Sequence, residues 1–192
     1  MEQISEKKAA LRSQLRKMRR ELDREALYRA SELLCARLLE LPELQRAQTV
    51  FCYVSYGGEV ETHRLIEKML SLDKRVLVPR CKAHGMMDCV PILSLDQLVP
   101  GMKGILEPPA ELGAADPQTV EFAVLPAVGC GEDGSRLGQG GGYYDRFLER
   151  VSCDHAVLCL EDFLLPSVPS EPHDQIMKYI VTQQRVLRFE EL

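Results

Sequence analysis

A glycine-rich segment between residues 136 and 145 carries the clearest chemical signal in this sequence. It reads Arg-Leu-Gly-Gln-Gly-Gly-Gly-Tyr-Tyr-Asp, with four glycines in five positions. Because glycine loses more conformational freedom on folding than other residues, such a run is expected where the backbone must approach a ligand closely. Its N–H groups could hold an anion beside a helix start, with Arg136 adding charge and Asp145 holding Mg²⁺. The alternative is a flexible turn above a core that contains Tyr143 and Tyr144.

Two other nucleotide-binding signatures are absent or incomplete. The sequence contains no G-x-x-x-x-G-K-[ST], which excludes a Walker-type phosphate loop. Residues Gly129 to Gly134 match G-x-G-x-x-G after an apolar run, but the residues that follow do not read as the helix that a dinucleotide-binding fold requires. We interpret this earlier segment as a turn without ligand.

Positive charge gathers near the N-terminus. Lys8 and Arg12 are four residues apart and therefore lie on one face of a helix, where two cations could grip a triphosphate. The helix itself is predicted from apolar residues at helical spacing, namely Leu11, Leu15, Met18 and Leu22. The alternative for the basic residues is a solvated face that binds nothing.

Acidic residues in two other segments could complete a site. Glu59 follows a predicted strand and could accept hydrogen bonds from a polar heterocycle such as a pterin. Its alternative role, as an acid that complements the following helix, fits Glu61 better. Asp174 could add a second carboxylate to a metal site, although by itself it has the sequence context of an ordinary turn residue.

Composition limits the classes to which these residues can belong. The 192 residues suit one domain, and 45% hydrophobic with 28% charged residues is ordinary for a globular protein. A net charge of −5 argues against a broad nucleic-acid-binding surface. No apolar run approaches the roughly 20 residues of a membrane span, and no signal peptide is evident. We therefore expect a cytoplasmic protein without nucleic-acid or membrane partners. A monomer is expected as well, although composition does not bear on the quaternary state.

The seven cysteines are scattered and contain no C-x-x-C pair. Neither a disulfide framework nor a zinc ribbon is therefore predicted. We interpret the cysteines as small buried apolar residues and assign them no chemistry.

The elements that must position these residues follow from hydrophobic periodicity and from turn residues. Residues 1–41 are predicted to form two helices. Asp23 separates them as the N-cap of the second helix, which ends near Pro42. Strands and helices then alternate. Strands are predicted over residues 49–54, 75–78, 87–92, 121–125 and 156–160, two short edge strands over 179–182 and 186–189, and helices over 62–70, capped by Thr62, and 143–151. Residues 100–117 are expected to form a long irregular connection.

This alternation predicts an α/β fold: a mostly parallel central sheet covered by helices on both faces, in one Rossmann-like domain over residues 1–192 with residues 1–41 packed on it. Ligands are expected at the carboxyl ends of the strands. The glycine-rich segment falls at that position.

Taken together, these motifs resemble the 5-formyltetrahydrofolate cyclo-ligase family, also called methenyltetrahydrofolate synthetase. The likeness runs from about Lys8 to Thr182. The family's K-x-x-x-R matches Lys8 and Arg12, its strand-loop acid matches Glu59, and its R-[LF]-G-x-G-x-G-Y-Y-D matches residues 136–145. One departure is Lys178, where many members carry an acid.

The resemblance implies a role for each matching residue. ATP would be bound by Lys8, Arg12, Arg136, Leu137, Gly138, Gln139, Gly140, Gly141, Gly142, Tyr143 and Tyr144, with Lys8 and Arg136 also catalytic. The folate would be bound by Val54, Glu59, Gln139, Gly140, Gly141, Gly142 and Tyr143. The metal, Mg²⁺, would be held by Asp145 and Asp174.

The implied reaction transfers the γ-phosphoryl group of ATP to the formyl oxygen of 5-formyltetrahydrofolate. N10 then attacks, and loss of phosphate gives 5,10-methenyltetrahydrofolate. Phosphorylation turns a poor leaving group into a good one, so the protein needs positioning, cations and Mg²⁺ and no nucleophilic side chain. Three alternatives stay open at this point: a related enzyme for another carboxamide or carbonyl substrate, a non-catalytic sensor of a phosphate ligand, and an RNA-binding module.

Overall fold

The computed structural model describes residues 2–101 and 104–189 of the chain. Its centre is a 7-stranded sheet in the order β12-β11-β9-β6-β1-β2-β3, in which β12 and β3 run antiparallel to their neighbours and the other pairs are parallel. The strands are β1 (Thr49–Cys52), β2 (Arg75–Cys81), β3 (Met87–Ile92), β6 (Phe122–Pro126), β9 (Asp154–Leu158), β11 (Tyr179–Val181) and β12 (Val186–Arg188). The predicted α/β class with a mostly parallel sheet is confirmed.

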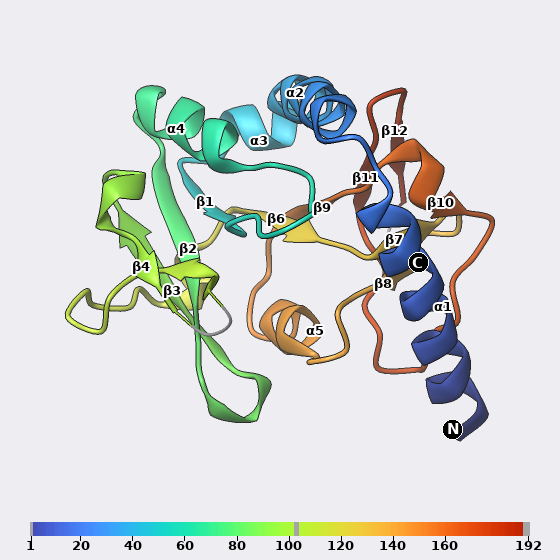
Figure 1. Ribbon diagram of the computed structural model, residues 1–192. Helices are drawn as coiled ribbons and strands as arrows, with labels where there is room; N and C mark the ends of the chain where they lie inside the picture. The colour runs from blue at the N-terminus through green and yellow to red at the C-terminus, as the bar shows by residue number, and fades with distance from the viewer. Residues whose placement is uncertain (1, 102–103, 190–192) are drawn as a thin grey trace.

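Helices lie on both sides of this sheet. They are α1 (Glu2–Arg20), α2 (Arg24–Leu39), α3 (Pro42–Arg46), α4 (His63–Ser71) and α5 (Tyr143–Leu148). Figure 1 shows α2, α3 and α4 above the sheet, α5 below it, and α1 running along one end of the molecule. None of the helices in the described ranges has the length and apolarity needed to cross a membrane.

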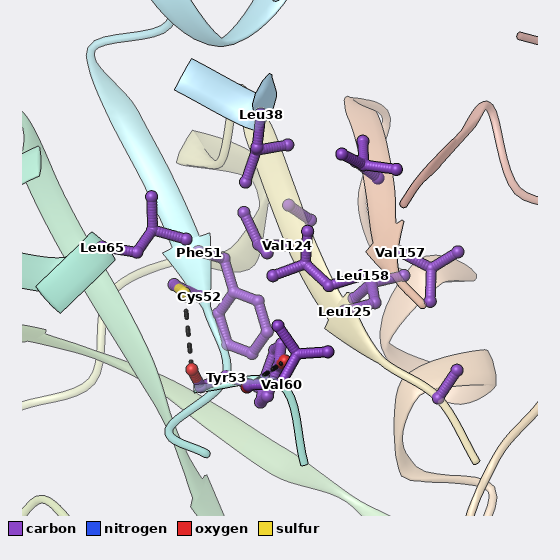
Figure 2. Close-up of a cluster of buried hydrophobic side chains, with 14 of the residues drawn as sticks. Leu38, Phe51, Cys52, Tyr53, Val60, Leu65, Val124, Leu125, Val157 and Leu158 are labelled. Carbon is purple, nitrogen blue, oxygen red and sulfur yellow. Dashed lines mark hydrogen bonds between the residues drawn. The ribbon is translucent and has the colours of Figure 1, made fainter. Parts of the chain in front are cut away.

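The core forms where the central strands meet these helices. Phe51, Val124 and Val157 come from three adjacent strands and are fully buried, and Figure 2 shows them in one cluster with Leu38 from α2. Phe51 also stacks on Phe147 of α5 with ring centroids 4.3 Å apart. Strands of a parallel sheet are covered on both faces, which explains why their sequences are continuous apolar runs.

A second, three-stranded sheet, which was not predicted, carries Arg136 and Leu137 of the predicted site. It has the order β10-β7-β8, formed by β7 (Gly129–Gly131), β8 (Arg136–Leu137) and β10 (Leu164–Leu165). The segment Gly129–Gly134, which we call the first glycine segment, is thus a β-strand and the turn of a hairpin. The interpretation of the whole segment as a turn is therefore wrong for Gly129–Gly131, which form β7. The expectation that no dinucleotide-binding helix follows it is confirmed, because β8 comes next.

Several local predictions need correction. The second helix ends at Leu39, and a separate helix starts at Pro42, because proline suits the first helical position. Thr62 precedes α4 but makes no side-chain capping bond; its hydroxyl donates to Tyr53 O instead. Met18 is 38% exposed, so it does not continue the buried stripe of α1.

Two predictions about extended segments also change. The C-terminal strand β11 is an interior strand, because β9 and β12 flank it, and only β12 forms the edge. The connection over residues 100–117 contains a small hairpin of β4 (Val99–Pro100) and β5 (Leu106–Glu107). The remaining short elements are the 3₁₀ turns η1 (Ala83–Gly85), η2 (Leu95–Gln97), η4 (Pro117–Thr119) and η5 (Glu161–Phe163).

Candidate active site

Residues 138–142, which we call the glycine loop, connect β8 of the small sheet to α5. The backbone at Gly140 and Gly142 has φ angles of 99° and 65°. These left-handed conformations are accessible to glycine and strained for most other residues, which explains two of the four glycines. Gly138 is explained by packing, because a Cβ there would lie 3.0 Å from Nη1 of Arg136.

Three carbonyl groups of the glycine loop are each held by a different arginine. The bonds run from Arg12 Nε to Gly138 O at 2.8 Å, from Arg16 Nη2 to Gln139 O at 3.0 Å, and from Arg146 Nη1 to Gly141 O at 2.9 Å. Because a trans peptide directs its C=O and N–H in opposite directions, each of these bonds also fixes the direction of the next residue's N–H. The arginines therefore set the orientation of the loop's donors.

The amide groups of the glycine loop have no acceptor among the described residues. None of residues 138–142 donates a backbone hydrogen bond there, although their carbonyls are in use. The loop is exposed or half-buried, so the amides can reach solvent or a ligand. Successive free N–H groups next to cationic side chains are the chemistry of a phosphate-binding loop.

Lys8 brings α1 to a carboxylate pair far along the chain. Its ammonium group donates to Asp174 Oδ2 at 2.5 Å and to Glu171 Oε2 at 2.8 Å, and the residue is only 6% exposed. Burial lowers the pKa of Lys8, but these bonds outweigh it and the net pKa lies above the ordinary value. Burial raises the pKa of Asp174, but the hydrogen bond from Lys8 and the bond from Glu171 N lower it by more. The net pKa of this carboxyl therefore lies below its ordinary value.

The candidate metal ligands differ from the predicted pair. Glu171, His173 and Asp174 bring their ligand atoms within 4.8 Å of one another. Asp145 is outside this group and instead accepts from Arg136 Nη2 at 2.6 Å. The carboxylates of Glu171 and Asp174 offer the oxygen donors that Mg²⁺ prefers, so this cluster fits a divalent cation that would share or displace the contacts of Lys8.

Arg136 is buried just before the glycine loop begins. It lies in β8 with a side chain 2% exposed, and it donates to Asp145 and, at 3.2 Å, to Pro126 O. Its Nε has no partner among the described residues. Leu137 beside it is 1% exposed, and its carbonyl accepts from Val128 N. Both residues thus support the base of the glycine loop.

Glu59 lies next to the glycine loop on the side of β1. Its carboxylate accepts from Tyr56 N at 3.0 Å and from Gln139 Nε2 at 3.4 Å. Burial raises the pKa of Glu59, and these bonds and the charge of Arg19 only partly oppose that shift. Val54, which lies between β1 and Glu59, is a buried apolar residue. The fold therefore joins two motifs that are distant in sequence.

The two tyrosines at the start of α5 are half-buried rather than packed wholly in the core. Tyr143 donates from its hydroxyl to Lys82 O at 3.3 Å. Tyr144 lies under the guanidinium of Arg136, 5.9 Å from the ring centroid, and burial raises its pKa well above the ordinary value. This raised pKa disfavours ionisation of the Tyr144 hydroxyl.

The profile of the 5-formyltetrahydrofolate cyclo-ligase family matches residues 4–183, a span that holds all of these groups. The chain belongs to this family. It is 32% identical over 145 residues to the 5-formyltetrahydrofolate cyclo-ligase of Mycolicibacterium smegmatis, covering 72% of this chain and 75% of the relative. It is 27% identical over 189 residues to the mouse cyclo-ligase, covering 89% and 91%.

The fold comparison agrees with this assignment. The solution structure of Aquifex aeolicus 5,10-methenyltetrahydrofolate synthetase superposes with a TM-score of 0.86 at 29% identity, covering 96% of this chain and 93% of that one. The cyclo-ligase fold, with its mostly parallel sheet, is therefore shared along nearly the whole chain.

Four residues of the site were missed from the sequence. Arg16 and Arg146 hold loop carbonyls, Glu171 shares Lys8 with Asp174, and Lys82 accepts from Tyr143. Arg16 follows Arg12 by one helical turn, which was a usable signal. Glu171 and Lys82 have partners that are distant in the chain, so nothing in the local sequence marks them. Arg146 lies close to Gly141 in sequence, but its type and spacing do not indicate that it binds this carbonyl.

Proposed function

We propose that this cyclo-ligase converts 5-formyltetrahydrofolate to 5,10-methenyltetrahydrofolate with hydrolysis of ATP to ADP and phosphate, in a reaction that requires Mg²⁺. The observation that carries the proposal is the glycine loop, whose carbonyls are held by arginines while its amides are free to bind phosphate oxygens. Phosphoryl transfer depends mainly on positioning and on neutralised charge, which such a loop supplies.

The residues divide into two sides of one site. On the ATP side, the amides of the glycine loop would bind phosphate oxygens while Lys8 and Arg12 add positive charge. Arg136, which is buried beneath the loop, would contribute through its ion pair with Asp145. On the folate side, Glu59 and Gln139 would accept and donate hydrogen bonds to the polar edge of the pterin, with Val54 and Tyr143 supplying apolar contact.

Glu171 and Asp174 would hold the metal, with His173 at the rim of the same cluster. Bound there, Mg²⁺ would neutralise charge on the phosphates of ATP. Asp145 was also expected to be a ligand, and it can take that role if the bond from Arg136 is given up. Lys8 would balance the charge of the two carboxylates when no cation is bound.

Within this site the γ-phosphoryl group moves to the formyl oxygen, N10 attacks the activated carbon, and phosphate leaves with that oxygen. The protein holds the formyl oxygen near the phosphate and excludes water, and no covalent enzyme intermediate is needed. The described cysteines fit this account. Burial raises the pKa of Cys35, Cys89 and Cys153 to about 12, so these thiols are poor nucleophiles.

The test mixes purified protein with 5-formyltetrahydrofolate, ATP and MgCl₂ and follows the absorbance of the methenyl product. Product should form with all three components and not when ATP is omitted or a chelator is in excess. No product in the complete mixture would overturn the proposed reaction. Undiminished product formation in excess chelator would show that the reaction occurs but does not require Mg²⁺.

We also propose that residues 1–192 act as a single Rossmann-like domain, monomeric and cytoplasmic. The seven free thiols suit a reducing compartment. Sedimentation velocity would test the monomer, and fractionation of cells would test the location.

A further inference from the structure

The tip of the hairpin between β2 and β3 packs against the glycine loop, and none of the roles above explains this contact. Tyr143 donates to Lys82 O at 3.3 Å, while Arg146 Nη1 donates to Gly141 O at 2.9 Å and also to Gly85 O at 3.4 Å. Figure 1 shows this hairpin extending beyond the sheet on the side where α5 lies. One guanidinium therefore joins two turns that are far apart in sequence.

Both turns present glycine at the point where they meet this guanidinium. A Cβ on Gly85 would clash with Arg146 Nη1 and lie 2.8 Å from Gly141 O, and a Cβ on Gly142 would lie 2.8 Å from Arg146 Nη1. Gly85 and Gly142 also have positive φ angles, of 70° and 65°. Side chains at these positions would separate the two turns, so their glycines serve close approach as well as conformation.

The bond from Arg146 has a direct consequence for the loop's donors. Gly141 O and Gly142 N–H belong to the same planar peptide, and holding the oxygen toward Arg146 directs the N–H the opposite way. Without that bond, rotation of this peptide would turn a carbonyl toward the site. A carbonyl oxygen repels phosphate oxygens, whereas an N–H binds them.

We propose that Arg146 is a positioning residue for nucleotide binding, with the β2–β3 hairpin tip as the second support of the glycine loop. This inference rests on the proposed function, because it requires the loop to bind the phosphates of ATP. Arg146 does not touch the reacting atoms. It fixes the orientation of one peptide, and Gly85 holds the guanidinium that does so.

The matched control is Arg150, which lies four residues after Arg146, just beyond the end of α5. It donates to O of Met87, the first residue of β3 after the hairpin turn, at 3.0 Å, and it contacts no carbonyl of the glycine loop. Arg146→Ala and Arg150→Ala thus remove the same side chain from neighbouring positions. They differ in whether the glycine loop loses a bond.

Binding of a non-hydrolysable ATP analogue with MgCl₂ is measured by calorimetry, beside the KM values for ATP and folate, kcat and the thermal midpoint. Arg146→Ala should weaken analogue binding and raise KM for ATP by about 5- to 10-fold, with KM for folate and the thermal midpoint nearly unchanged. Arg150→Ala should change neither affinity. Gly85→Ala should resemble Arg146→Ala, and combining the two should add little, because both act through one contact.

Analogue binding by Arg146→Ala equal to that of the wild type would overturn the inference, as would equal losses in both arginine variants with lowered thermal midpoints. If the wild type binds the analogue but forms no methenyl product, the proposed reaction fails while the inference is still decided by the binding data. If the wild type binds no nucleotide, both fail together.

Discussion

The first glycine segment and the glycine loop are both rich in glycine, but their backbone amides have different partners. In the first glycine segment, Gly131 N donates to Ser135 O at 2.8 Å and Gly134 N donates to Gly131 O at 3.0 Å. In the glycine loop, the carbonyls are held by arginines and the amides of residues 138–142 have no acceptor in the described chain. Glycine content alone therefore does not identify a ligand-binding loop; the partners of the amides do.

The two segments also need glycine for different reasons. A Cβ on Gly131 would lie 2.9 Å from the backbone Cα of Ser167, so there the limit is packing. At Gly140 the nearest atoms, from Arg12, are 3.5 Å or more from a Cβ, and the limit is the φ angle of 99°. Substitutions at these positions should therefore separate loss of stability from loss of function.

The largest effect on turnover is expected from Gly140→Ala. Alanine is strained at this φ angle, and the exposed loop can relieve the strain by changing the orientation of its peptides. We expect kcat/KM for ATP to fall by roughly 100-fold, which corresponds to about 2.7 kcal/mol, with little change in thermal midpoint. The control is Gly113→Ala, at an exposed glycine with no heavy atom within 4 Å of a Cβ. Normal kinetics in the Gly140 variant would contradict a phosphate-binding role for the loop.

Gly131→Ala should have the opposite signature. The added methyl meets backbone that cannot move without disturbing the small sheet, so we expect the free energy of unfolding to fall by about 2 kcal/mol. The protein that stays folded should retain its KM for ATP, because the amides of this segment bind the protein itself. Chemical denaturation and steady-state kinetics measure the two quantities. A raised KM with unchanged stability would remove the distinction between the two glycine segments.

Asp174→Asn tests the segment that is anchored on the first glycine segment, where Met177 N donates to Gly134 O. The pKa values of Asp174 and Glu171 lie below their ordinary values of 3.8 and 4.5, so their stabilising effect is present above those values and is lost as the pH falls through the lowered pKa values. The variant should melt about 3 °C lower at pH 7, in the presence of a chelator. The difference in melting temperature should shrink as the pH falls through the lowered pKa of Asp174, which lies below 3.8, and should vanish below it. A difference that persists below that pKa would contradict the ion pair with Lys8.

Glu59→Gln should give the smallest effect and sharpen the boundary between the two sides of the site. We expect KM for folate to rise about 5-fold and KM for ATP to stay constant, because one charged hydrogen-bond acceptor becomes neutral. Since burial raises the pKa of Glu59 above 4.5, wild-type KM for folate should also increase as the pH falls through that raised pKa, and the variant should lack this dependence. Glu61→Gln is the control, as Glu61 binds His63 N instead. If KM for ATP rose more than KM for folate, the assignment of Glu59 to the folate side would be wrong.

The sequence by itself determined the class of the fold and the position of the glycine loop. Buried parallel strands are continuous apolar runs, and helices have their own period, so both can be identified from residues that are close in the chain. The distinction between the two glycine-rich segments was also available locally, because the first lacks a following helix. The family motifs around Lys8, Glu59 and Arg136 were recognised for the same reason.

Only the tertiary structure decided which groups are partners. Lys8 binds Glu171 and Asp174 across most of the chain length, and Asp145 pairs with a buried Arg136 rather than joining Asp174. Residue type and spacing give the charge of a side chain but not the segment that returns to meet it. The orientation of the loop's peptides likewise depends on side chains outside the loop, because a peptide can rotate until a donor fixes its carbonyl. Two of these donors are arginines of the distant α1, and the third is Arg146 of the adjoining α5.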